Sequence, residues 1–354
     1  MKKFFILLLG LTFMAASCDL TGGLFDLGTG TRGVVKSEDS GETYSAANIL
    51  QKKGDISGIG VNSLVFDPSK PDTLYLGSSN GIYKSEDAAK SWRYILSGIT
   101  IADIALDPLQ SNVIYAAGIV GANGKIIKSL DGGVSWVDIY TEPSKNNTVL
   151  SIAVGRSNSL VLAGLTTGEI LRSVDKGHTW QASKDFADRI TKILLNASGT
   201  VYALTFHKGL MKSTDQGISW TMISDLLTKS SVSSFDQAPS SVSAFYDMAL
   251  DQRQPGVLYL GTQEGLYRST NDGVNWSFLG LPEKNTSLRV SALSVNPNNS
   301  NNLFVAVSST IFKSANGGLT WETKILPTQS EVRRILINPQ ANNLIYLGLA
   351  APRQ

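Results

Sequence analysis

The feature that most constrains the fold is a nine-residue segment that recurs seven times along the chain. Its pattern is K/R-S-x-D/N-x-G-x-x-W, and successive copies lie about 40 to 56 residues apart. A recurring period of this kind is typical of repeat architectures, in which each copy marks one supersecondary unit. The copies, which we call boxes, are KSEDSGETY (36–44), KSEDAAKSW (84–92), KSLDGGVSW (128–136), RSVDKGHTW (172–180), KSTDQGISW (212–220), RSTNDGVNW (268–276) and KSANGGLTW (313–321).

Three positions of the box have a physical reason. The Asp or Asn accepts hydrogen bonds from the amides of its own turn, and the glycine supplies a left-handed backbone position. The tryptophan carries a large apolar area that locks one sheet against its neighbour. Two boxes depart, with Ala89 in place of the glycine and Tyr44 in place of the tryptophan. We therefore predict structural roles for Asp39, Asp87, Asp131, Asp175, Asp215, Asn271, Asn316, Trp92, Trp136, Trp180, Trp220, Trp276 and Trp321.

Short β-rich runs bounded by turn residues surround each box. One unit shows them as NSLVFDP (62–68), TLYLGSS (73–79) and GIYKSED (81–87). The run that contains the box tryptophan adds a fourth strand, and we name the four strands A to D in chain order. Four-stranded units at this period indicate the blades of a β-propeller.

The two ends of the repeat region complete each other. The N-terminal copy (32–44) has strands C and D only, and the C-terminal copy (332–349) has strands A and B only. Pairing them closes the ring and leaves no sheet edge open, whereas a linear solenoid would keep two incomplete ends. We therefore predict an all-β protein with a single seven-bladed β-propeller of four-stranded blades over residues 33–354. Its last blade is closed by N-terminal (33–48) and C-terminal (331–349) strands.

The N-terminus reads as an export signal. Lys2 and Lys3 precede a short apolar run, and small residues lead up to Cys18, so residues 1–17 are predicted to be a signal peptide. The small residues before a lone cysteine resemble a bacterial lipobox, although Ala15 stands where such boxes usually carry Leu. The resemblance implies lipidation of Cys18 and an exported protein anchored to a bacterial membrane. The segment after Cys18 is rich in Gly and Thr, so residues 18–32 are predicted to be the lipidated cysteine and a flexible tether. The alternative is an ordinary signal peptide with an incidental cysteine.

Composition restricts the partners and cofactors. The net charge is +2, with 31 basic and 29 acidic side chains, which gives no support for a nucleic-acid partner. The chain has 1 cysteine and 2 histidines, so it can form no internal disulfide and lacks the ligands of an ordinary zinc site. No calcium-binding loop motif is present. We predict no metal and no cofactor, and we expect a monomer.

The box resembles the Asp-box, or BNR, repeat of sialidases, sortilin-type receptors, xyloglucanase-type glycosidases and photosystem II assembly/stability factor propellers. The resemblance covers residues 32–349 and is specific for fold rather than function. A sialidase would need six blades and an F/Y-R-I-P motif, which this chain lacks. A xyloglucanase would generally use two propellers around a glycan, and a sortilin-type receptor would add a cysteine-rich module. The assembly-factor plan, one seven-bladed propeller without a catalytic motif, matches best.

Candidate functional residues lie on one face of the predicted ring. The A–B and C–D turns share the face that carries the boxes, so recognition is expected on the opposite face, formed by the D–A loops and B–C turns. We call it the loop face. Its arginines could cluster to grip carboxylates, or Asp188 and Glu331 could neutralise them. The predicted binding residues are Arg189, Arg289, Arg333, Arg334, His207, Lys208, Glu264 and Phe235.

Phe235 belongs to the longest connection, residues 224–244, which is either a lid over the channel or a tolerated insertion. Glycoside cleavage would require two carboxyl groups about 5 to 10 Å apart, and Asp103, Asp188 and Asp247 are the weak candidates. The sequence favours a non-enzymatic binding or assembly scaffold of the cell envelope that recognises a protein or peptide partner through the loop face. The alternative is a glycan-binding or glycoside hydrolase propeller, xyloglucanase-like rather than sialidase-like.

Overall fold

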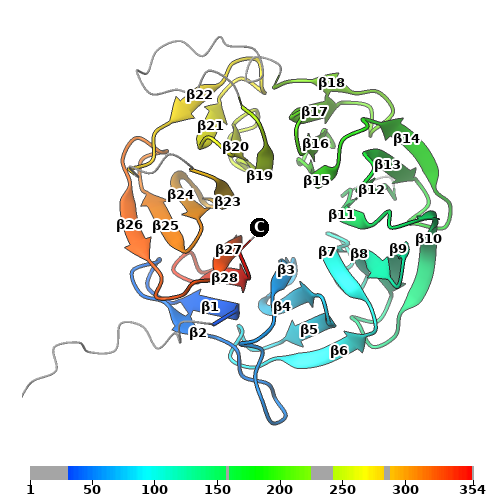
Figure 1. The fold of residues 1–354 in the computed structure, drawn as a ribbon, viewed down its shortest axis with the longest axis horizontal. Coiled ribbons are helices and arrows are strands. Elements are labelled where there is room, and N and C mark those ends of the chain that lie inside the picture. Colours follow the sequence, from blue (N-terminus) through cyan, green and yellow to red (C-terminus); the bar gives the residue numbers. More distant parts are fainter. Residues whose placement is uncertain (1–30, 157–158, 225–241, 283–287, 353–354) are drawn as a thin grey trace, which may run out of the picture.

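A computed structural model shows a ring of seven four-stranded antiparallel sheets around a central channel (Figure 1). It describes residues 31–156, 159–224, 242–282 and 288–352. We number the blades in chain order, and the composite blade is the seventh. Blades one to three contain β3 (Val61–Asp67), β4 (Lys70–Ser78), β5 (Gly81–Ser85), β6 (Arg93–Ser97), β7 (Thr100–Leu106), β8 (Ile114–Val120), β9 (Asn123–Ser129), β10 (Val137–Lys145), β11 (Val149–Val154), β12 (Val161–Leu165), β13 (Glu169–Ser173) and β14 (Gln181–Asp185).

The remaining blades follow the same order. Blades four to six contain β15 (Ile190–Leu195), β16 (Val201–Thr205), β17 (Leu210–Ser213), β18 (Thr221–Met222), β19 (Phe245–Leu250), β20 (Leu258–Thr262), β21 (Leu266–Ser269), β22 (Ser277–Leu279), β23 (Val290–Asn296), β24 (Asn299–Val307), β25 (Thr310–Ser314) and β26 (Glu322–Ile325). Blade seven contains β27 (Glu331–Ile337), β28 (Ile345–Ala350), β1 (Gly33–Ser37) and β2 (Ser45–Ala46).

Blade seven closes the ring with both ends of the repeat region. Strand β1 pairs antiparallel with β28, from Gly33 opposite Leu349 to Ser37 opposite Ile345. The sheet order is β2-β1-β28-β27, so the blue and red ends of the chain share one sheet (Figure 1). The predicted fold, blade count and composite closing blade are therefore confirmed.

Burial explains which strands are apolar and which are polar. All five residues of β12, β16 and β20 are buried, because each blade is covered on both faces by its neighbours. Outer strands such as β14 are largely exposed. The apolar clusters join adjacent blades: Tyr115 of blade two packs with Val161 and Leu171 of blade three, and Trp180 covers that cluster. Each box tryptophan thus belongs to a core shared by two blades.

The box forms a hydrogen-bonded turn in which its serine is as important as its aspartate. In blade two, the Ser129 hydroxyl donates to Asp131 Oδ1 at 2.7 Å and accepts the Gly133 amide at 2.8 Å. Asp131 also accepts the Ser135 amide at 2.9 Å. The serine hydroxyl therefore joins both arms of the turn, a contribution that the repeat pattern alone did not explain.

The predicted signal peptide and Cys18 lie outside the described residues. Of the predicted tether, only residues 31 and 32 are described. Within the part of the chain that the structure describes, no helix is both long and apolar enough to cross a membrane.

Candidate binding face

Backbone hydrogen bonds confirm the assignment of the two faces. On one face, boxes bond to the A–B turn of their own blade, as Gly132 N does to Asn112 O at 2.9 Å. On the other, B–C turns bond to D–A loops, as Phe206 N does to Arg189 O at 2.9 Å. Arg189, His207 and Lys208 therefore lie together on the loop face.

A β-bulge lies near the start of every innermost strand, and it sets side chains of the wall of the ring, where neighbouring innermost strands meet. In β7, for example, the register shifts between Ile101 and Asp103. A bulge places two residues opposite one and redirects the side chain that follows. The equivalent residues after the bulge are Ser63, Asp103, Ser151, Lys192, Asp247, Ala292 and Arg334.

Asp103 ties three blades together. Its Oδ1 accepts the Ser63 hydroxyl of blade one at 2.9 Å and the Ile104 amide at 3.0 Å. Its Oδ2 accepts the Ser151 hydroxyl at 3.2 Å and the Ile152 amide at 3.1 Å, both from blade three. Both oxygens of this candidate catalytic carboxylate are therefore engaged in the wall of the ring.

Asp247 occupies the equivalent position in blade five. Its Oδ1 receives Lys192 Nζ of blade four at 2.5 Å, and its Oδ2 accepts the Leu293 amide of blade six at 2.9 Å. Lys192 also donates to the Met248 carbonyl at 2.9 Å. Asp247 thus repeats the bridging role of Asp103, with a lysine partner in place of serine.

Asp188 closes the B–C turn of blade four. Its Oδ2 accepts the amides of His207 and Lys208 at 2.6 and 2.8 Å, and its Oδ1 lies 3.0 Å from His207 Nδ1. Burial acts to raise the pKa of Asp188, but hydrogen bonds from these two residues outweigh it and hold the pKa below its ordinary value. Asp188 therefore orders the turn that presents His207 and Lys208, and no described arginine pairs with it.

A row of cationic and aromatic side chains crosses the loop face from blade four to blade five. The Arg189 guanidinium lies 4.3 Å from the centre of the Phe206 ring, and Phe206 packs edge-on against Tyr246 at 5.4 Å. Arg189 is exposed and has no carboxylate partner among the described residues. A guanidinium over an aromatic face keeps its charge and its outward donors.

The row continues through blades six and seven. Arg289 lies 5.5 Å from the Tyr246 ring centre and donates to Glu331 Oε1 at 2.7 Å. Arg333 Nε donates to Glu331 Oε2 at 3.4 Å, and its Nη2 donates to the Ala351 carbonyl at 2.7 Å. The Glu331 side chain is 1% exposed. We call Arg189, Phe206, Tyr246, Arg289, Glu331 and Arg333 the cation–aromatic arc.

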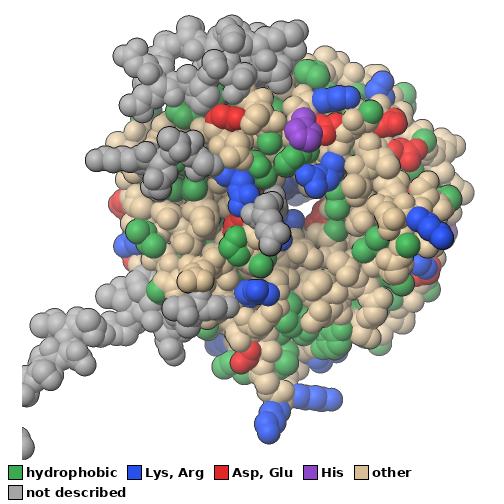
Figure 2. Space-filling view, in the orientation of Figure 1, with side chains coloured by type: hydrophobic (Ala, Val, Ile, Leu, Met, Phe, Trp, Pro, Cys, Tyr) green, Lys and Arg blue, Asp and Glu red, His purple; other side chains and the backbone are tan. Residues whose placement is uncertain are grey.

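Other predicted binding residues lie nearby but have different surroundings. Arg334 follows the bulge of β27, and its Nη1 donates to the Arg333 carbonyl at 2.9 Å. Glu264, in the B–C turn of blade five, accepts the Ser243 amide at 3.0 Å. Phe235 lies outside the described residues, as does most of the predicted loop. Figure 2 shows Lys and Arg side chains bordering the central opening.

Sequence reasoning missed Lys192, Phe206 and Tyr246. The sequence does contain a signal for the residue that follows each bulge. It is the third residue of a four-residue segment that begins and ends with an apolar residue, and the seven segments are VNSL, IADI, VLSI, ITKI, FYDM, VSAL and VRRI. Simple alternation of buried and exposed residues hides it, because the bulge inserts one residue. Phe206 and Tyr246 differ in kind from their counterparts in other blades, so no repeat pattern points to them.

The fold and this face define a seven-bladed propeller with a structural box face and a cation-bearing loop face. Residues 112–348 match the family described as the DUF6242 beta propeller domain, and the chain belongs to that family. The match covers more than half of the chain and includes all six residues of the cation–aromatic arc.

Two further groups of proteins are similar to this chain. A xyloglucanase of a Paenibacillus species is 25% identical over 283 residues, which are 71% of this chain and 24% of that protein. The crystal structure of the GH74 enzyme of Niastella koreensis superposes with a TM-score of 0.64 and 18% identity, over 82% of this chain and 51% of that one. The chain therefore spans about a quarter of that curated relative and about half of the solved enzyme.

Solved structures of YCF48 resemble the ring over nearly their whole length. YCF48 from Cyanidioschyzon merolae has a TM-score of 0.61 at 13% identity, over 82% of this chain and 95% of that one. YCF48 bound to D1 peptide has a TM-score of 0.60 at 17% identity, over 82% and 94%. At these identities the likeness shows the fold, a single propeller of the same extent.

Proposed function

We propose that this protein is a non-enzymatic binding scaffold that holds a peptide segment of a protein partner on its loop face. The observation that carries the proposal is the cation–aromatic arc, above all exposed Arg189, which lies over Phe206 without a carboxylate partner among the described residues. Such a surface offers planar donors to peptide carbonyls and carboxylates and an aromatic face to apolar side chains.

The carboxylates of the same region support binding over hydrolysis. Asp103 and Asp247 connect blades across the channel wall, and Asp188 closes a turn. Acid and base catalysis on a glycan requires two carboxyl groups that are free to exchange protons with the substrate. The peptide-bound structure of YCF48 shows that a single propeller of this extent can hold a peptide, which supports the same use here.

Glycan binding is the second candidate, favoured by the similarity to xyloglucanases. A soluble glycan would lie on the same arc, since aromatic rings and arginines also contact sugars. We place this candidate second because the chain spans only part of those enzymes and its three candidate carboxylates are engaged in hydrogen bonds within the fold.

Selection from a library of displayed random peptides, against the full chain immobilised in one orientation, tests the proposal. We expect peptides with acidic and aromatic residues to be enriched, and we expect Arg189→Gln to weaken their binding by at least tenfold. Arg253→Gln is the matched control, because Arg253 is exposed in the A–B turn of blade five on the opposite face. Equal binding to both variants would refute the role of the arc. Release of reducing ends from xyloglucan by the wild type, abolished by Asp103→Asn, would favour the glycosidase instead.

We further propose that the propeller is exported and lipid-anchored at Cys18, as its N-terminal residues suggest. The test is intact-mass analysis of the protein purified from bacterial membranes. Loss of residues 1–17 and a mass gain matching acyl chains support the anchor if both disappear in Cys18→Ala. A wild-type chain that retains its N-terminus and lacks acyl groups contradicts it.

A further inference from the structure

The D–A loop that leads from β2 of blade seven to β3 of blade one forms a projecting hairpin. It spans residues 47–60, whereas only Gly98 and Ile99 join β6 to β7 at the next junction. Figure 1 shows the hairpin extending outward from the ring where blades seven and one meet. Its tip, residues 51–54, is exposed. A long connection within a compact domain is commonly functional, so this hairpin is a candidate interaction surface.

Backbone hydrogen bonds fix the hairpin against the outer edge of blade one. The Trp92 amide donates to the Ile49 carbonyl at 2.8 Å, and the Gln51 amide donates to the Trp92 carbonyl at 2.9 Å. Within the hairpin, the Ile56 amide donates to the Asn48 carbonyl at 2.9 Å. An ordered base therefore presents the tip beside β6, the outermost strand of blade one.

The tip of the hairpin is basic. Lys52 and Lys53 are exposed and have no carboxylate within ion-pair distance among the described residues. Figure 2 shows Lys or Arg side chains at the outer end of the projection. Asp55, the acidic residue of the hairpin, accepts the Ser57 hydroxyl and amide at 2.5 and 2.9 Å, which holds the Asp55 pKa below its ordinary value. Its carboxylate is engaged within its own turn, so the charges of the two lysines are unpaired.

Exposed apolar and basic side chains extend this surface along the edge of blade one. Ile49 is 64% exposed and Tyr94 is 45% exposed, although both side chains are large and apolar. Arg93 is also exposed, and its nearest carboxylate, Glu86, lies 3.7 Å away. Basic side chains with aliphatic and tyrosine neighbours favour the interface between a bilayer and water. We call this surface the basic rim; it consists of Ile49, Lys52, Lys53, Arg93 and Tyr94.

The chain from the proposed lipid anchor reaches the ring beside the hairpin. The Arg32 amide donates to the Ser57 carbonyl at 2.7 Å, and the Gly33 amide donates to the Ile59 carbonyl at 2.8 Å. Roughly 13 residues separate Cys18 from residue 31, and a chain of that length spans at most about 45 Å. An acylated Cys18 therefore keeps the basic rim within reach of the membrane surface.

We propose that the basic rim docks on the headgroups of anionic phospholipids in the membrane that holds the Cys18 anchor; this inference rests on the anchor proposed above. Each lysine beside an anionic surface strengthens binding about fivefold. Two lysines alone bind weakly, but the anchor holds the rim at a high effective concentration near the lipid. Because the rim lies on the outer edge of blade one, docking sets the ring on its edge. Both faces, including the loop face, then stay open to partners.

Lysine footprinting of the full chain tests the docking. The protein is reconstituted in vesicles of phosphatidylcholine and phosphatidylglycerol, its lysines are acetylated with a water-soluble reagent, and each site is quantified by mass spectrometry. We expect the vesicles to slow acetylation of Lys52 and Lys53 by at least about fivefold relative to the protein in detergent. The protection should disappear on vesicles of phosphatidylcholine alone and in about 1 M salt, where the Debye length is about 3 Å.

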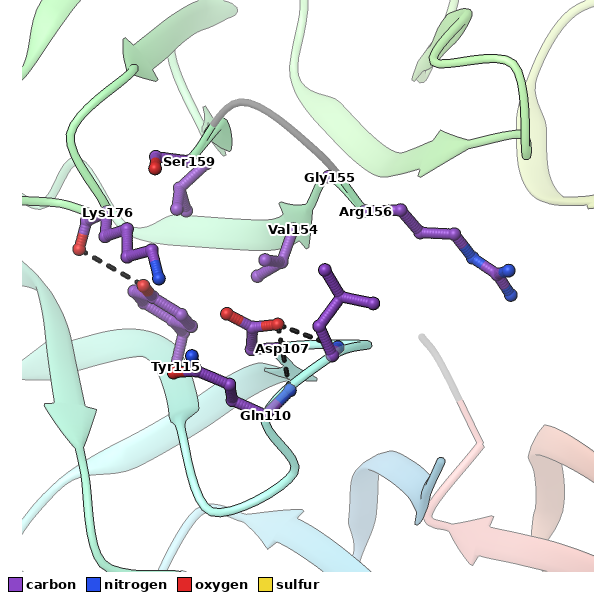
Figure 3. A pocket seen from close by; sticks show the side chains of 10 residues that line it. Asp107, Gln110, Tyr115, Val154, Gly155, Arg156, Ser159 and Lys176 are labelled. Atoms are coloured by element: carbon purple, nitrogen blue, oxygen red, sulfur yellow. Dashed lines mark hydrogen bonds between the residues drawn. The ribbon is translucent and has the colours of Figure 1, made fainter. Parts of the chain in front are cut away.

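Lys70 and Lys90 are matched controls at the opposite end of blade one, and both are exposed. Lys70 follows the A–B turn that Asp67 closes by accepting the Lys70 amide at 3.1 Å, the arrangement that Figure 3 shows for Asp107 in blade two. Lys90 belongs to the box. The vesicles should leave acetylation of both controls unchanged. Lys52→Gln should reduce the protection of Lys53 about fivefold, whereas Lys90→Gln should leave it intact.

The intact mass of the same preparation reports acylation, so failure of the anchor and failure of docking are distinguishable. If the chain carries no acyl groups, its single thiol, at Cys18, can be coupled to a maleimide-bearing lipid, and the footprint still decides. Equal acetylation rates at rim and control lysines on anionic vesicles overturn the proposal, as does protection that persists on neutral vesicles. Equal protection by soluble polyphosphate without vesicles would assign the rim to a soluble polyanion and would overturn it as well.

Discussion

Replacing Asp103 with alanine is expected to destabilise the whole ring rather than a single turn. Its carboxylate accepts four hydrogen bonds, from Ser63, Ile104, Ser151 and Ile152, and these belong to three blades. The two serine hydroxyls can rotate toward other acceptors. The Ile152 amide cannot, because it is fixed in strand β11 and Ile152 is only 3% exposed. The cost therefore centres on that amide and on the link between blades two and three.

The magnitude follows from these contacts. Leaving a buried donor without a partner costs about 1–3 kcal/mol, and a hydrogen bond to a charged group contributes about 1.5–3 kcal/mol. Since these terms overlap, we expect Asp103→Ala to lower the free energy of unfolding by about 3–4 kcal/mol. Asp103→Asn keeps one acceptor oxygen and should cost about half as much.

Equilibrium urea denaturation, followed by tryptophan fluorescence and circular dichroism, measures the effect. The control is Asp138→Ala, which removes an exposed pair with Lys125 and should cost less than about 1 kcal/mol. If Asp103→Ala unfolds at the same urea midpoint as Asp138→Ala, the reasoning is wrong and Asp103 is free for another role.

Three further predictions concern the boxes. Gly133→Ala should destabilise the protein by about 1–3 kcal/mol more than Gly132→Ala in thermal melts. A Cβ at Gly133 would lie 2.7 Å from Ile95 Cδ1, whereas the nearest atom to a Cβ at Gly132 is 4.0 Å away. Equal melting temperatures of the two variants would contradict this. Trp92→Phe should cost about 1–2 kcal/mol more than Trp321→Phe in urea, because Trp92 Nε1 donates to the Ala47 carbonyl at 2.7 Å, whereas Trp321 Nε1 has no partner among the described residues. Hydrogen bonds from Ser135 and Ser129 lower the pKa of Asp131 in the folded protein. Ionised Asp131 therefore contributes its full stability above the unfolded pKa of about 3.9, and this contribution is lost as the pH falls through the lower folded pKa. Asp131→Asn, the residue found in two other boxes, should therefore melt below the wild type at pH 7 and approach it by about pH 2, and a constant difference in melting temperature across this range would refute the linkage.

The repeat predicted the fold because each box position acts within its own blade or at the junction with the next. Trp180 illustrates this: its role in the shared core depends on size and period, which the sequence displays directly. Closure also followed from counting strands, since β1 and β28 must pair for the sheet of blade seven to be complete.

The functional faces were less predictable because they depend on geometry that the repeat does not encode. The sequence left two alternatives for the loop-face arginines, a cluster that grips carboxylates or neutralisation by Asp188 and Glu331. In the structure Glu331 accepts from both Arg289 and Arg333. Arg189 approaches the same arc only through Phe206 and Tyr246, which bridge the intervening blade. No spacing rule predicts such a contact, because it arises from the turn that Asp188 orders.

The cation–aromatic arc occurs where blades four and five depart from the repeat, and this has a physical reason. Positions that follow the repeat are occupied by bonds between blades, as Ser151 shows by donating to Asp103 and accepting the Ile193 amide at 3.0 Å. A side chain that holds two blades together has little hydrogen-bonding capacity left for a ligand. Where Phe206 supports Arg189, which has no carboxylate partner among the described residues, that capacity is free. In a ring built from self-satisfied units, irregular positions are therefore where ligand chemistry should be sought first.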